Sequence, residues 1–219
     1  NAVMTREINR DRTSAIRWII TTFYIKILLI IASVLAIILV APFFIKIPAS
    51  QTLLPIFALM VFIDGLKDFG VAIMRAFEKM EWDAFANTVS NVITVAAGAI
   101  TLSVNPTPLY LATSYLIGSI GGALLALIPL RQYFRNIVAG FSKELIKPIL
   151  TAGWPIAIWG MLASILTYTD SIMLGYLKDA TAVGIYSAAL KPVQLLFVLP
   201  GFLAMSIFPT FARRADGKG

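Results

Sequence analysis

The chain has 219 residues and a formal charge of +7, with 59% hydrophobic and only 13% charged residues. A soluble domain is roughly half apolar and about a quarter charged, so this composition predicts a membrane protein. The absence of cysteine and histidine excludes disulfides, Ser/His/Asp or Cys/His catalysis and histidine-containing metal sites. Carboxylates, lysines and hydroxyls remain as the only candidates for chemistry. We expect no catalytic residue, no metal site, no cofactor and no nucleic-acid partner.

The first segment, "NAVMTREINRDRTSAIRW", is polar where a signal peptide would need a short apolar core. It also lacks an initiator methionine. We expect residues 1–18 to form a cytoplasmic leader and the chain to be an internal fragment of a longer protein.

Apolar runs of about twenty residues then follow one another, each long enough to cross a hydrocarbon core of about 30 Å as a helix. The sequence predicts an all-α, polytopic helical membrane protein with six transmembrane helices. Their expected ranges are 19–45, 53–74, 84–104, 109–130, 148–176 and 183–210.

Gaps rich in lysine and arginine alternate along the chain with gaps that are almost free of them. The leader, the second gap, the fourth gap and the tail together hold thirteen, whereas the other gaps hold only Lys46 and Lys178. This asymmetry places both ends in the cytoplasm. The segment 131–147 is the longest and most basic gap, so we expect it to join a first half, 19–130, to a second half, 148–210, which is followed by a cytoplasmic tail at 211–219.

The second span carries ionisable groups in "DGLKDFGVAIMR". On a helix, one face within an arc of about 100° holds Asp64, Lys67, Asp68, Arg75 and Glu78. A charge at mid-membrane costs about 2.5–3.5 kcal/mol, so these groups should face protein or water. Two readings stay open: an internal ion cluster that holds helices together, or the wall of a water-filled cavity that meets a charged cargo.

Polar residues lie along one face of the third span, and small residues recur along the fourth. On the third, one face holds Asn87, Ser90, Asn91, Thr94, Gly98 and Thr101, which suits either a neighbouring helix or a lumen. On the fourth, a small residue recurs every four positions at Ser114, Gly118, Gly122 and Ala126, which predicts close helix packing.

The last two spans contain Pro155, Pro192 and Pro200 within apolar helix, where each should kink the helix or free a carbonyl. Asp170 and Lys191 are expected at similar membrane depths. They could form a structural ion pair, or Lys191 could contact cargo.

The segment "TDSIMLGYLKDATAVGIYSAALKPVQLLFVLPGFLAMSIFPTFAR" and the inner turn "RAFEKMEWDAFAN" resemble the polysaccharide biosynthesis transporters. These are the Wzx-type oligosaccharide flippases of the MOP superfamily, which also holds the MATE exporters. The resemblance spans nearly the whole chain. It implies a two-lobe transporter of roughly fourteen helices, of which this chain would supply the third to the eighth, with the basic linker between the lobes.

The resemblance further implies alternating access, in which a polyprenyl-diphosphate-linked oligosaccharide crosses the plasma membrane of a prokaryotic cell. Cationic cavity residues would meet the diphosphate, a role that falls first on Lys67 and Lys191 and next on Arg75 and Lys26. Asp64 and Asp68 would line the same cavity, while Asp170, Asn87 and Asn91 are structural or coupling candidates. Expected partners are the lipid-linked oligosaccharide, the bilayer and other glycan-assembly membrane proteins.

Three other functions stay open. A MATE-like exporter of cations would use Asp64, Asp68 and Asp170, although Lys67 between the first two favours an anionic cargo. An intramembrane lipid enzyme would hold Mg²⁺ on Asp64 and Asp68, but most of the aspartate signature of such enzymes is absent. A purely structural subunit would leave the charged stripes of separate helices unconnected.

Overall fold

The computed structural model describes residues 15–45, 48–128 and 141–196, and the described segments are helical throughout, with no strand among them. The chain divides into two compact units, Asn1–Pro155 and Ile156–Gly219. The elements are α2 (Ala15–Leu39), α3 (Ala41–Phe44), α4 (Pro48–Gln51), α5 (Leu54–Ala76), α6 (Met80–Val104), α7 (Pro108–Leu127), the 3₁₀ turn η4 (Lys143–Leu145), α8 (Ile146–Leu177) and α9 (Ala180–Leu196).

Four helical segments of the described chain are long and apolar enough to cross a membrane: Ala15–Phe43, Met80–Val104, Pro108–Leu127 and Lys143–Leu177. The all-α fold is confirmed, and these segments make the chain an integral membrane protein. The other two expected spans stay predictions. α5 has 23 residues but carries three charges near its centre, and α9 is described over only 17 residues.

Helix bounds differ from the sequence expectation mainly at the ends. α2 begins at Ala15 rather than at residue 19, and α6 begins at Met80 rather than at residue 84. Both helices thus take in polar residues that a hydropathy count leaves out. Most of the linker 131–147, the second half of the sixth span and the tail 211–219 lie outside the described residues.

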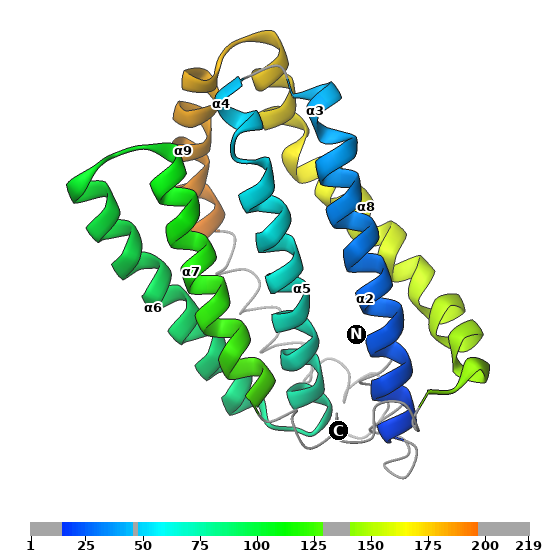
Figure 1. Ribbon diagram of the computed structural model, residues 1–219. Coiled ribbons are helices and arrows are strands. Elements are labelled where there is room, and N and C mark those ends of the chain that lie inside the picture. The colour runs from blue at the N-terminus through cyan, green and yellow to red at the C-terminus, as the bar shows by residue number, and fades with distance from the viewer. Residues whose placement is uncertain (1–14, 46–47, 129–140, 197–219) are drawn as a thin grey trace, which may run out of the picture. The chain divides into compact units, whose positions relative to one another are not determined.

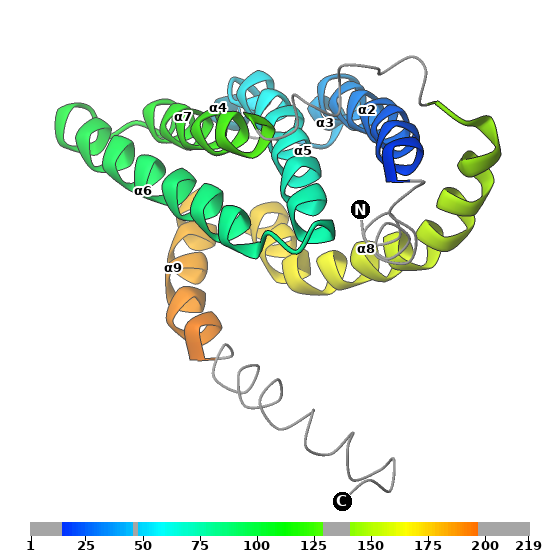
Figure 2. The same cartoon turned by 90° about the horizontal axis from the view of Figure 1, so that it is seen from below.

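In the first unit, α5 lies between α2 and α7, and α6 packs against α7 (Figure 1). Seen from below, α6 lies to one side of the row formed by α2, α5 and α7 (Figure 2). The apolar core lies at the N-terminal end of α2 and the C-terminal end of α5, where Ile19, Phe69 and Ile73 are fully buried. The rings of Phe23 and Phe69 join the two helices, with centroids 5.4 Å apart.

Glycines allow the close approach of α7 to its neighbours, which confirms the packing role predicted for the small residues of the fourth span. A Cβ at Gly118 would lie 1.8 Å from Oγ1 of Thr94, and one at Gly70 would lie 2.6 Å from the carbonyl oxygen of Ala126. Any larger residue at these positions would push the helices apart.

The turn between α5 and α6 ends α5 with two backbone hydrogen bonds. The N–H of Lys79 donates to the carbonyl of Met74 at 2.9 Å, and that of Glu78 donates to Arg75 at 3.1 Å. Glu78 has a φ of 61°, the left-handed conformation that this type of helix ending requires. The turn therefore fixes how Arg75 faces the start of α6.

Candidate functional site

The charged residues of α5 do not all face the same way. Nζ of Lys67 lies 3.2 Å from Oδ1 of Asp64, and the Lys67 side chain is only 15% exposed. Its stem lies against α7, because a Cβ at Gly122 would be 3.0 Å from Cδ of Lys67. Lys67 therefore packs between helices, whereas Asp64 is 42% exposed and Asp68 is also exposed.

Ser119 of α7 is the second partner of Asp64. Its hydroxyl donates to Oδ1 at 2.7 Å, so one carboxylate oxygen receives both Ser119 and Lys67. Sequence reasoning missed Ser119. The signal was present in its position beside Gly118, next to the stripe of small residues that brings α7 against its neighbours. This small polar cluster of Asp64, Lys67 and Ser119 ties α5 to α7.

The polar face of α6 forms a seam with α7. Ser90 donates to the carbonyl of Gly118 at 2.8 Å, and the hydroxyls of Thr101 and Ser114 lie 2.9 Å apart. Thr94 bonds the carbonyl of Ser90 within α6. These groups hold helices together, which is one of the two readings that the sequence allowed for this face. Asn91, by contrast, is exposed.

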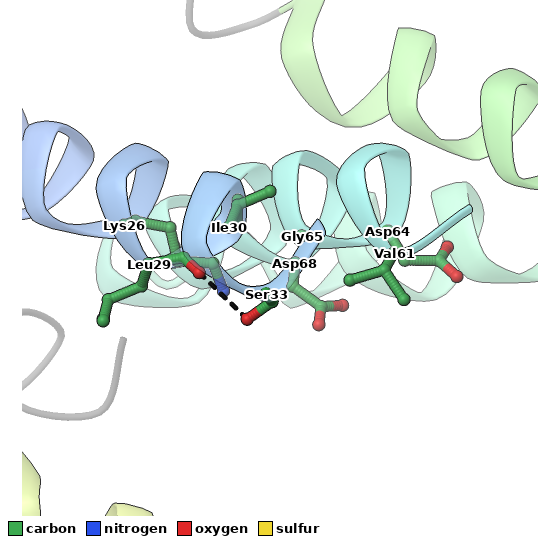
Figure 3. A pocket seen from close by; sticks show the side chains of 8 residues that line it. All are labelled: Lys26, Leu29, Ile30, Ser33, Val61, Asp64, Gly65 and Asp68. Carbon is green, nitrogen blue, oxygen red and sulfur yellow. Dashed lines mark hydrogen bonds between the residues drawn. The ribbon is translucent and has the colours of Figure 1, made fainter. Parts of the chain in front are cut away.

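A groove with a volume of about 410 Å³ lies between α2 and α5, beside the place where the two helices touch (Figure 3). Two carboxylates, from Asp64 and Asp68, extend from neighbouring turns of α5 into its lining. α2 contributes one cation, Lys26. The remaining lining residues are Leu29, Ile30, Ser33, Val61 and Gly65. The structure thus brings Lys26, Asp64 and Asp68 together along this groove, while the Lys67 ammonium lies beside Asp64 and its stem packs against α7.

At the turn between α5 and α6, Arg75 and Asn87 both bind Asp83. Nε of Arg75 is bonded to Oδ2 of Asp83, and the amide of Asn87 donates to Oδ1 at 2.6 Å. The Arg75 side chain remains 56% exposed. Asn87 therefore serves the structure of the turn, while the guanidinium of Arg75 still faces outward with much of its surface.

In the second unit, the hydroxyl of Tyr186 donates to Oδ2 of Asp170 at 2.7 Å, which joins α8 to α9. No ion pair links Asp170 to Lys191 among the residues described in this unit, and Lys191 is exposed. Tyr186 was not among the residues that the sequence singled out. Its position two turns into α9, opposite the end of α8, explains the contact.

Within the described residues, no group of three or more Asp, Glu, His or Cys side chains could hold a metal ion. The arrangement contains ion pairs, hydrogen bonds and one charged groove between helices.

A helical bundle with several apolar segments of membrane length defines a polytopic membrane protein. The model of the family described as "Polysaccharide biosynthesis protein" matches residues 1–214. The chain therefore belongs to the polysaccharide biosynthesis protein family of Wzx-like flippases. The comparisons with curated proteins and with solved structures gave no match.

Proposed function

We propose that the protein flips a polyprenyl-diphosphate-linked oligosaccharide across the plasma membrane of a prokaryotic cell, by alternating access and without chemical change to the cargo. The observation that carries the proposal is the family match over residues 1–214. The groove between α2 and α5 supports it, because charged side chains at membrane depth are costly unless they face water, protein or a ligand.

Lys26 is the best placed cation of the described part for contact with a diphosphate, since it lines the groove and forms no ion pair with another described residue. Arg75 and Lys191 are exposed and remain candidates. Lys67 is a weaker candidate than the sequence suggested. Its ammonium is occupied by Asp64, and its contact with cargo would require that pair to open.

Glycan analysis of cells that lack the protein tests this function. We expect lipid-linked repeat units to accumulate on the cytoplasmic side, and expression of the intact protein from a plasmid should clear them. Normal glycan export in the deletion strain would contradict the proposal.

A MATE-like cation exporter is the second candidate, and one observation favours it. Asp64 and Asp68 both line the same groove, and the Lys67 stem packs against α7 rather than into the groove. In that case the deletion strain would export its glycans normally and become sensitive to cationic drugs. The same strain therefore separates the two functions.

A further inference from the structure

The groove between α2 and α5 combines three kinds of chemistry on two helices. The carboxylates of Asp64 and Asp68 lie one helical turn apart along α5, about 6 Å in rise. Lys26 supplies hydrogen-bond donors from α2. Leu29, Ile30 and Val61 supply an apolar wall. A sugar ring has the matching properties, because its hydroxyls donate and accept hydrogen bonds while its C–H faces are apolar.

Asp64 is held in one orientation by residues outside the groove. Its Oδ1 receives the hydroxyl of Ser119 at 2.7 Å and lies 3.2 Å from Nζ of Lys67. Within the described residues, Oδ2 has no hydrogen-bond partner, and the side chain is 42% exposed. One oxygen is thus anchored on α7, and the other is free to accept a hydrogen bond from a ligand. An acceptor fixed in this way loses little freedom when the ligand binds.

The groove also has a suitable size and shape. Its volume of about 410 Å³ falls in the range of about 300–1,000 Å³ found for small-molecule sites. Gly65 forms part of its wall, and a Cβ there would lie 2.6 Å from Cδ1 of Ile30. The glycine therefore lets α2 and α5 approach each other beside the charged residues.

We propose that this groove is the subsite for a sugar of the cargo, with Asp64 Oδ2 and the Asp68 carboxylate accepting hydrogen bonds from its hydroxyls and Lys26 donating to one of its oxygens. The inference rests on the proposed function and adds the part of the cargo that α5 recognises.

The test compares two probes on the purified protein: a short-chain polyprenyl diphosphate, and the same lipid carrying one glucose residue. Asp68 is the residue to change, because changing Asp64 would also strand Lys67. We expect the glycosylated lipid to bind the unaltered protein at least about tenfold more tightly, since one good hydrogen bond to a charged group contributes about that factor. Asp68→Leu should lower that ratio severalfold, because its hydrogen bond is lost while those of Asp64 and Lys26 remain, and should leave the affinity for the bare lipid unchanged.

Asp68→Asn keeps an acceptor oxygen and should retain part of the preference for the glycosylated lipid. Glu81→Gln, a change of an exposed acid in the first turn of α6, is the matched control and should retain all of it. Equal binding of the two lipids by the unaltered protein would overturn the inference and leave the proposed function standing. Failure to bind either lipid would overturn both. If Asp68→Asn lost the preference for the glycosylated lipid completely, and if lipid binding by the unaltered protein depended on Na⁺, the groove would be assigned to a cation instead.

Discussion

Lys67 illustrates at the residue scale how a charge is tolerated within α5. Its ammonium lies beside Asp64, its stem packs against Gly122, and its side chain is 15% exposed. Asp64 in turn is bonded to Ser119. A helical projection of the sequence places Lys67 and the two aspartates on one broad face of α5. It does not show that one part of this face packs against α7 while the other part borders the groove with α2.

The structure therefore predicts a stabilising role for Lys67. Lys67→Met should lower the thermal stability of the purified protein, because it leaves the Asp64 carboxylate with Ser119 alone between two helices. The cost is about 1–3 kcal/mol, the range for a buried group that loses its partner, and the 42% exposure of Asp64 places it toward the lower end. The midpoint of thermal unfolding in detergent measures it.

The double variant Lys67→Met with Asp64→Asn is the control. It removes both charges and should recover most of the lost stability, since neither partner is left unpaired. If the double variant were as unstable as the sum of the two single variants, the pair would not be a stabilising unit.

At the element scale, the contact of α6 with α7 depends on residues without bulk. A Cβ at Gly118 would lie 1.8 Å from Oγ1 of Thr94 and 2.8 Å from the carbonyl oxygen of Ser90. Both neighbours are committed to hydrogen bonds, because Thr94 donates to Ser90 and Ser90 donates to Gly118. The contact between α6 and α7 therefore cannot accommodate a Cβ at Gly118 without breaking one of these hydrogen bonds.

Gly118→Ala should accordingly destabilise the protein, by about 1–3 kcal/mol for an overpacked site. Gly153→Ala is a matched control in α8, since a Cβ there meets no atom within 4 Å. That change should be neutral or stabilise by up to about 1 kcal/mol through helix propensity. Equal thermal midpoints for the two variants would show that the close contact at Gly118 does not govern packing.

The sequence predicted the helices and their packing better than it predicted the hydrogen-bond partners of their side chains. Hydropathy located the helices, and the spacing of Gly118 and Gly122 indicated their packing role, because both signals are local and periodic. The partners of Asp64 and Asp170 could not be predicted, since Ser119 and Tyr186 come from other helices. An ion pair of Asp170 with Lys191 was one of two possibilities that their similar depth allowed, and depth does not specify which way a side chain faces around its helix.

At the scale of the whole molecule, the account depends on orientation in the membrane. The basic residues predict that the turn at Asn105 faces outward and the turn at Lys79 faces the cytoplasm. The chain has no cysteine, so a single introduced one reports its own position. Both residues are exposed in the structure.

A membrane-impermeant thiol reagent should label a cysteine at Asn105 in intact cells. A cysteine at Lys79 should react only after the cells are opened. Labelling of the Lys79 position from outside would show that the orientation is inverted, and with it the side from which cargo enters.

The central claim is that the protein moves a lipid-linked glycan, and transport by the purified protein in liposomes tests it most directly. A fluorescent polyprenyl-diphosphate glycan placed in one leaflet should become accessible to a lectin on the opposite side. Lys26→Ala should slow this at least about tenfold, the effect of losing one contact to a charged group, at unchanged protein content. Liposomes that export a cationic dye but leave the glycan in place would contradict the account.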